Sequence, residues 1–186
     1  MKNGNKTIIF GVTLSIILVI IIAGFFLFNP SKKTTSSSPL EIALTLSDLP
    51  VGYSIQERSE RLKSDVSEDA LNRGWQSGYY TRYFRGENLA DFTKIEQYVS
   101  VYPLENITLL LQKDITVSEE ETLEKMPSQN MGDGSKSYRV TNNEFGNTWY
   151  SFEFIKKDVY VRLDMFGTAT DYELLKSLAK KIENKI

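Results

Sequence analysis

The amino-terminal part of the chain contains a run of 21 residues without a charged side chain, from Ile8 to Phe28. As an α-helix rising 1.5 Å per residue, this run would be about 31 Å long, which matches a hydrocarbon core of about 30 Å. A helix satisfies its own backbone hydrogen bonds in lipid, where no water is available to do so. The sequence therefore predicts a transmembrane helix over residues 8–28.

A cleaved signal peptide is the main alternative interpretation of this run. Signal peptides have an apolar core of about 7–15 residues that ends in a small-x-small cleavage site, whereas this run is longer and is followed by Asn29 and Pro30. The chain has no cysteine, so a lipoprotein anchor is impossible. We expect an uncleaved signal-anchor that crosses the cell membrane once. An amino-terminal helix behind a short basic segment leaves residues 1–7 in the cytoplasm and the carboxy-terminal domain outside.

The residues after the apolar run separate into a linker and one domain. Residues 29–39 are rich in Ser and Thr and lack apolar side chains to bury, so they predict a flexible tether. Residues 40–186 are long enough to enclose one hydrophobic core. Four lysines precede residue 40, which leaves 18 basic against 24 acidic residues in the domain and a net charge near −6. This charge argues against nucleic acid as a partner, because a duplex-binding surface needs clustered Lys and Arg.

The chain contains neither histidine nor cysteine. Ser-His-Asp and Cys-His nucleophilic systems, and metal sites built from thiolate or imidazole ligands, are thereby excluded. We expect no catalytic residues, no metal site and no cofactor. Chemistry by carboxylates, tyrosine or a Ser/Lys pair is not excluded by composition.

Hydrophobic periodicity and turn signals divide the domain into strands and helices. The period of two is clearest from Val159 to Met165, where apolar residues alternate with Tyr160, Arg162 and Asp164. The pattern predicts a helical entry segment over 40–47, strands over 53–63, 75–85, 92–103, 135–141, 148–155 and 159–165, and helices after Ser67, Pro103, Ser118 and Thr170. Strands dominate and do not alternate regularly with helices. We therefore expect an α+β fold in which helices pack on an antiparallel sheet.

Three of these helices are predicted from capping signals. Ser67 can cap the first of them, and Glu68 and Asp69 suit its positive end. Ser118 with Glu121 resembles a capping box, and Pro127 would end the helix that follows. In that interpretation, the acidic run 119–121 forms the solvated first turn of the helix. Thr170 with Glu173 predicts the start of the last helix in the same way.

Three local motifs suggest chemistry but favour structural explanations. Residues 131–135 contain a single carboxylate, which favours a turn before a strand over a calcium loop. Lys136 lies between Ser135 and Ser137, yet alternation along a strand would point it away from both serines. Asn106 opens an N-glycosylation triplet and is a candidate glycosylation site.

The aromatic residues are the remaining candidates for binding, although aromatic residues in strands usually fill the core. We single out five as a candidate aromatic face, with Trp149 and Tyr160 as further members of the set. Stacking on sugars or contact with a partner peptide would be the natural uses of such a face. The five residues are Trp75, Tyr79, Tyr83, Tyr98 and Tyr102.

Several short motifs together resemble a known family. They are Asp48-Leu49-Pro50-Val51-Gly52-Tyr53, Gly74-Trp75 with Gly78-Tyr79, Val99-Ser100-Val101-Tyr102-Pro103, Gly132-Asp133-Gly134-Ser135 with Tyr138-Arg139, and Leu178-Ala179-Lys180-Lys181-Ile182. The series resembles an uncharacterised family of archaeal and bacterial extracytoplasmic domains carried behind a signal or anchor. The order of elements also resembles the Mog1/PsbP-like sandwich. This resemblance implies a fold and a location, but no active site.

Three functional hypotheses follow from the sequence. The first is a membrane-anchored extracytoplasmic binding or accessory module without catalytic activity, with a protein or carbohydrate partner at the cell surface. The second is a carboxylate-dependent hydrolase of surface polysaccharide, which would need two facing acidic groups. The third is a pilin-like structural subunit of the envelope, but the apolar run contains no acidic residue and no basic-Gly processing site precedes it.

Overall fold

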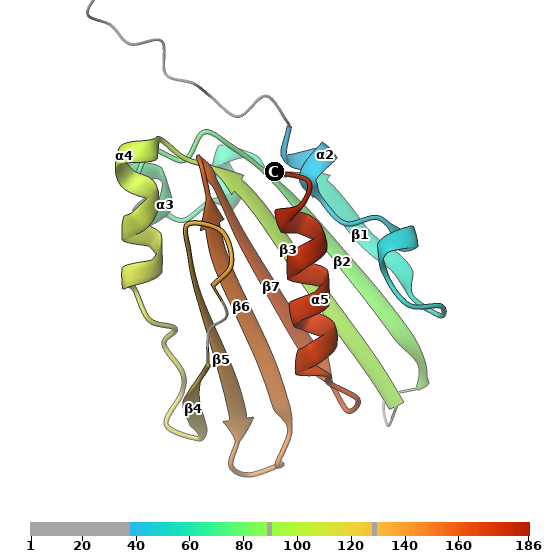
Figure 1. Cartoon of the computed structure of the whole chain (residues 1–186). Helices are drawn as coiled ribbons and strands as arrows, with labels where there is room; N and C mark the ends of the chain where they lie inside the picture. Colours follow the sequence, from blue (N-terminus) through green and yellow to red (C-terminus); the bar gives the residue numbers. More distant parts are fainter. Residues whose placement is uncertain (1–37, 89–90, 128–129) are drawn as a thin grey trace, which may run out of the picture. The chain divides into compact units, whose positions relative to one another are not determined.

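The computed structural model describes residues 38–88, 91–127 and 130–186, which form a seven-stranded antiparallel sheet with helices on both faces (Figure 1). The strands lie side by side in the order β1-β2-β3-β7-β6-β5-β4. Their bounds are β1 Ser54–Glu60, β2 Ser77–Asn88, β3 Asp91–Val101, β4 Glu121–Met126, β5 Gly134–Asn142, β6 Thr148–Lys156 and β7 Val159–Gly167. The α-helices are α2 Pro39–Ile42, α3 Glu68–Asn72, α4 Leu104–Ile107 and α5 Tyr172–Glu183, and the 3-10 helices are η1 Leu46–Asp48, η2 Lys63–Asp65 and η3 Thr108–Gln112. The α+β class predicted from the sequence is confirmed.

The sheet consists of two meanders joined by the last strand. β1, β2 and β3 follow one another in sequence and in space, and β4 to β7 do the same from the opposite edge. Between them the chain passes through α4 and η3 to reach the far edge at β4. β7 then pairs with β6 on one side and with β3 on the other. The two meanders therefore meet only through β7 within the described strands.

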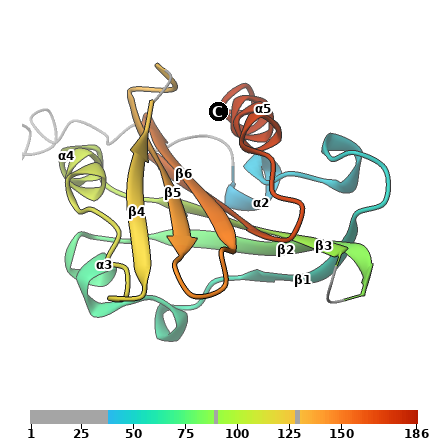
Figure 2. The ribbon, with the colours of Figure 1, turned by 90° about the horizontal axis from the view of Figure 1, so that it is seen from below.

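The main hydrophobic core lies between the sheet and the face covered by α5 and α2. Figure 2 shows α5 and α2 on one side of the curved sheet, and α3 and α4 on the other. The α5 side chains that contact the sheet recur at helical spacing, so one stripe of the helix is buried. These are Leu175, Leu178, Ala179 and Ile182. They pack against alternate residues of the central strands, including Val161, Leu163 and Met165 of β7.

A second, smaller core lies on the opposite face. It joins Val66 and Trp75 near α3 to Ile107 of α4, with Tyr102 and Ile155 of the sheet between them. Ser67 caps α3 as predicted, because its side chain accepts a hydrogen bond from the Ala70 backbone nitrogen. This cluster covers one end of the face, near α3 and α4.

The segment after Ser118 is a strand and not the helix that the capping signal predicted. Ser118 and Glu121 do form the local hydrogen bonds of the motif, since the Ser118 backbone nitrogen donates to Glu121 Oε2 at 3.1 Å. The next residues extend as β4 and pair with β5, where Leu123 lies opposite Val140. Pairing with an otherwise open sheet edge satisfies more backbone groups than an isolated helical turn would. The acidic run 119–121 is consequently not the first turn of a helix.

The last helix starts one residue later than predicted. Its N-cap is Asp171, whose carboxylate accepts hydrogen bonds from the backbone nitrogens of Glu173 and Leu174. The Thr170 hydroxyl instead donates to the Thr148 carbonyl oxygen at 3.4 Å. An aspartate is an equally good N-cap and its charge favours the positive helix end, which explains the shift.

The predicted anchor 8–28 lies outside the described residues, as does the tether up to residue 37. Ser38 and Pro39, assigned to the tether from the sequence, belong to the capped first turn of α2. Among residues 38–88, 91–127 and 130–186, no helix has the length and apolarity needed to cross a membrane.

Candidate functional site

The sheet face opposite α5 carries a layer of polar and charged side chains across its central strands. The residues share this face because side chains alternate along each strand and the strands are in register. One row crosses the sheet as Tyr98, Arg162, Glu153 and Lys136, on β3, β7, β6 and β5 respectively. A neighbouring row contains Glu96 of β3, Asp164 of β7 and Ser151 of β6. Arg162, Glu153 and Lys136 alternate in sign along the first row. In the second row Glu96 and Asp164 are both acidic, and they pair with Arg82 and Arg162 respectively, which compensates for their removal from water.

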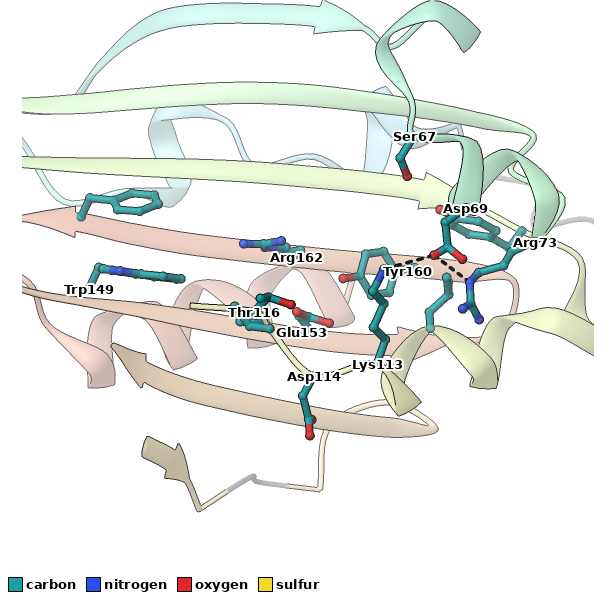
Figure 3. A pocket seen from close by; sticks show the side chains of 14 residues that line it. Ser67, Asp69, Arg73, Lys113, Asp114, Thr116, Trp149, Glu153, Tyr160 and Arg162 are labelled. Carbon is teal, nitrogen blue, oxygen red and sulfur yellow. Dashed lines mark hydrogen bonds and ion pairs between the residues drawn. The ribbon is translucent and has the colours of Figure 1, made fainter. Parts of the chain in front are cut away.

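A hollow of about 570 Å³ lies over this polar layer. Strands β6 and β7 form its floor, and residues near α3, together with residues from η3 to Thr116, form its rim (Figure 3). Its volume is within the range of about 300–1,000 Å³ that is usual for small-molecule sites. The lining residues are Ser67, Asp69, Arg73, Tyr102, Leu110, Lys113, Asp114, Ile115, Thr116, Trp149, Glu153, Tyr160, Arg162 and Phe166.

Arg162 is the central cation on the floor of the hollow. Its Nε donates to Asp164 on the same strand, at 3.0 Å from Oδ1 and 2.9 Å from Oδ2. Asp164 is only 2% exposed. Burial raises the pKa of the Asp164 carboxyl, although the Arg162 charge and hydrogen bond act in the opposite direction. The Arg162 side chain is 35% exposed, and Nη1 and Nη2 have no hydrogen-bond acceptor among the described residues. The Nε edge of the guanidinium is therefore held by Asp164, and its Nη1 and Nη2 atoms are available to a ligand.

An aromatic pair lies at one end of the hollow. The rings of Trp149 and Phe166 are stacked with their centroids 5.3 Å apart, and both side chains are half-buried. The Lys94 ammonium lies 4.5 Å from the centre of the Phe166 ring. Figure 3 shows Trp149 at the end of the hollow opposite Asp69 and Arg73. Such a pair offers a flat apolar surface beside the Arg162 guanidinium.

The other end of the hollow is lined by charges that already have partners. Asp69 receives Arg73 Nε at 3.1 Å and lies 3.7 Å from Lys113 Nζ. The Arg73 hydrogen bond is the main cause that lowers the pKa of the Asp69 carboxyl. Asp114 accepts a hydrogen bond of 2.5 Å from the Tyr138 hydroxyl.

Glu153 is the third carboxylate of the lining. It forms a buried ion pair of 3.3 Å with Lys136. Each of the three carboxylates of the hollow is therefore bound to a donor of the protein itself.

The five residues of the candidate aromatic face do not lie on one face. Tyr79 and Tyr83 belong to the main core on the α2 side, where the Tyr83 hydroxyl donates to the Leu44 carbonyl oxygen at 2.5 Å. Trp75 and Tyr102 are buried in the smaller core on the opposite side. Tyr98 is half-buried on that side, with its hydroxyl 3.2 Å from Glu96 Oε2. Of the five, only Tyr102 lines the hollow.

The further candidates Trp149 and Tyr160 both line the hollow. Arg162 and Phe166 were not singled out from the sequence as site residues. The available signal was the alternation over residues 159–165, which places Arg162 on the polar face of the strand. A charged side chain in a strand that is otherwise largely buried costs free energy unless it has a partner, and such a residue is therefore a candidate for a functional role.

The other sequence motifs have structural roles in the described residues. Asn106 lies on α4, and the amide nitrogen that would carry a glycan donates to the Arg73 carbonyl oxygen at 3.0 Å. Residues 131–135 form the turn before β5, and Gly132 has a φ of 59°. Lys136 points to the face opposite Ser137, whose hydroxyl lies 2.7 Å from the Tyr172 hydroxyl. Within the described ranges, no group of three or more acidic side chains could hold a metal ion.

The fold and the hollow define the class of the domain as an α+β module with one sheet face partly open to solvent. A scan against models of protein families and a search of curated proteins found no match to the chain. Among solved structures, the fold is similar to the extracellular domain of PknH from Mycobacterium tuberculosis, with a TM-score of 0.61 and 10% sequence identity. The similarity covers 83% of this chain and 98% of the PknH domain. It shows a shared fold, and it adds no support for the resemblance to the Mog1/PsbP-like sandwich.

Proposed function

We propose that the chain is a membrane-anchored extracytoplasmic binding module without catalytic activity, and that its ligand binds in the hollow over β6 and β7. The apolar run 8–28 supports the anchor. The fold similarity to a domain described as extracellular is compatible with this location. The chain has no histidine and no cysteine, which the commonest nucleophilic enzymes require, and this supports a binding function over an enzymatic one.

The observation that carries the proposal is the state of Arg162. The Arg162 guanidinium is partly withdrawn from water, and a charged group in such a position normally has hydrogen-bond partners. Here Asp164 occupies only the Nε edge, and the two terminal nitrogens face a hollow large enough for a small molecule. Trp149 supplies an apolar surface beside them. Convergent polar and aromatic groups in a concave site are the usual features of a ligand pocket.

The carboxylates of the hollow favour binding over hydrolysis. A glycoside hydrolase needs one carboxyl that donates a proton and a second that is free to act as base or nucleophile. Asp69, Asp114 and Glu153 are each bound to a donor of the protein. Asp164, whose pKa is raised, is buried and held by Arg162.

The ligand proposal is tested by thermal unfolding of the full-length chain in detergent with a panel of small polar and charged molecules. A ligand of the native state at about 100 times its Kd would stabilise it by about 2.7 kcal/mol. We expect at least one such ligand, and we expect its effect to disappear in the double variant R162Q/D164N. A panel without any stabilising compound, or a stabilising compound that is indifferent to this variant, would contradict the proposal.

The location is tested separately by external protease on intact cells. The proposal places residues 38–186 outside, so the protease should remove the domain and leave a short amino-terminal fragment in the membrane. Complete protection of the domain while a known surface protein is digested would contradict this topology.

A further inference from the structure

Building on the proposed function, we propose that the hollow binds an anionic sugar, and that Arg162 recognises its carboxylate while Trp149 supports the face of its ring. The inference rests on the spacing and chemistry of three groups of side chains. These are the free edge of the Arg162 guanidinium, the Trp149–Phe166 pair and the carboxylates of the rim and floor.

The charge of the ligand follows from the free edge of the Arg162 guanidinium. Arg162 presents Nη1 and Nη2 to the hollow, while Asp164 holds Nε and fixes the plane of the guanidinium. A guanidinium held in this way matches the two oxygens of a carboxylate and forms charge-assisted hydrogen bonds with it. Burial works to lower the pKa of Arg162, but the adjacent Asp164 charge raises it, so the side chain is always a cation. The central donor of the hollow therefore favours an anionic group.

The size of the ligand follows from the separation between Arg162 and the aromatic pair. Arg162 and Phe166 lie on the same face of β7 four residues apart, which is about 13 Å along a strand. The Arg162 side chain leans toward Asp164, so the guanidinium lies about 7 Å along the strand from Phe166. Phe166 in turn stacks on Trp149 of β6. A single six-membered ring with a carboxylate attached bridges this separation.

The polar groups of the lining favour a sugar over an aromatic acid. Besides the aromatic pair, the hollow presents the carboxylates of Asp69, Asp114 and Glu153 and the hydroxyls of Ser67 and Thr116. An ionised carboxylate has about four acceptor sites, so each of these three carboxylates keeps acceptor capacity beyond its protein donor. An aromatic ring would cover this capacity without a hydrogen bond, which costs free energy. Sugar hydroxyls donate to carboxylates, and a sugar ring presents C–H groups to an indole face. The lining thus matches a hydroxylated ring.

The test measures binding of three probes to the full-length chain in detergent by isothermal titration calorimetry. The probes are D-glucuronate, D-glucose without the carboxylate and benzoate without the hydroxyls. We expect D-glucuronate to bind more tightly than either control by about tenfold or more, as expected for a charge-assisted bidentate contact. Equal affinity for D-glucose would overturn the role of the carboxylate, and equal affinity for benzoate would overturn the sugar.

Variants assign the preference to the named residues. R162Q/D164N removes both charges together, so that no buried carboxylate is left without its partner, and should abolish the preference for D-glucuronate over D-glucose. Arg139→Gln is the matched control, because Arg139 pairs with Glu124 on the other face of the sheet, and should retain the preference. Trp149→Ala should weaken both sugars by about tenfold through loss of the stacking surface. A preference that survives in R162Q/D164N would overturn the proposal.

The outcome also separates this proposal from the broader one. If the three probes fail but another small molecule binds and depends on Arg162, the anionic sugar is wrong and the hollow is still a ligand site. If no molecule depends on Arg162, both proposals fail.

Discussion

Lys136 and Glu153 face each other across β5 and β6, with Lys136 Nζ 3.3 Å from Glu153 Oε2 and both side chains almost completely buried. Lys136 also donates to the Lys113 carbonyl oxygen, which ties the segment after η3 to the sheet. Glu153 of this pair lies on the floor of the hollow, next to Arg162 in the same row. The polar layer is thus part of the structure of the domain as well as of the candidate site.

Removing one partner of this pair should destabilise the domain strongly. Lys136→Met leaves the Glu153 carboxylate buried without its cation, and loss of one partner of a buried pair costs about 3–5 kcal/mol. The double variant K136M/E153L removes both charges and should recover most of the loss, because a buried ion pair contributes little beyond an apolar pair. Urea denaturation gives both free energies of unfolding. A double variant as unstable as K136M would show that the Lys113 contact, and not the uncompensated charge, is responsible.

Glu183 should stabilise the folded domain near neutral pH and lose this effect in acid. Hydrogen bonds from Lys180 and from the Gly132 backbone nitrogen lower the pKa of its carboxyl below the ordinary 4.5, against the effect of burial. A lowered folded pKa gives stability that is present above the unfolded pKa and is lost as the pH falls. Glu183→Gln should therefore cost about 1–2 kcal/mol at neutral pH, and this difference should shrink below pH 4.5.

The control for Glu183 lies on the same helix. Glu173 is exposed and pairs with Lys176 three residues on, so Glu173→Gln should change the free energy of unfolding by less than about 0.5 kcal/mol. Equal effects of the two substitutions would contradict a specific role for the contact with Gly132.

Asp164 should show the opposite dependence on pH. Its folded pKa lies above the ordinary 3.8 because of burial, so the folded state keeps a proton that the unfolded state has already released. Its contribution to stability therefore falls as the pH rises from 3.8 toward the raised value. The loss of stability caused by Asp164→Asn, measured by urea denaturation, should be larger at about pH 3.5 than at about pH 6. A loss that grows with pH would show that the attraction of Arg162 outweighs burial.

Gly132 should tolerate no side chain. Its φ of 59° is unfavourable for residues with a Cβ, and a Cβ built there would lie 2.1 Å from the Ile155 carbonyl oxygen. Gly132→Ala should therefore reduce the free energy of unfolding by about 3 kcal/mol or more. Gly146 is the matched control, because its φ is 68° but nothing lies within 4 Å of its Cβ position. Gly146→Ala should cost about 1 kcal/mol, and equal losses at the two positions would contradict the clash.

The fold was predictable wherever one sheet face or one helix stripe is clearly apolar. Val159 to Met165 alternates without interruption, and both the existence of β7 and the face of each side chain follow from that pattern. The stripe on α5 is equally clear, although the capping signal placed its start at Thr170 instead of Asp171. β4 was missed because its strand conformation depends on pairing with β5, which local sequence does not contain.

The candidate site was less predictable because its residues come from distant segments. The hollow is formed only when the connection from β3 to β4 crosses the sheet face. This connection brings Asp114 to the same hollow as Asp69, Trp149 and Arg162. Four of the five aromatic residues chosen by type are divided between two cores, and Tyr98 is half-buried outside both, since tyrosine on a strand fills either face equally well. Composition was enough to exclude mechanisms that need histidine or cysteine. The pairing of Glu153 with Arg162 depends on the register of β6 and β7, which composition does not contain.

The position of β7 has a consequence for how the chain acquires its structure during synthesis. β7 follows the other six described strands in sequence, yet it lies at the centre of the strand order. The edge of β3 that pairs with β7 therefore stays unpaired until more than fifty further residues have been synthesised. Non-local pairing of this kind slows folding and exposes strand edges to other chains. A released chain truncated before Val159 would lack the strand that pairs with both β3 and β6, so β1–β3 and β4–β6 should not join into a single cooperative sheet.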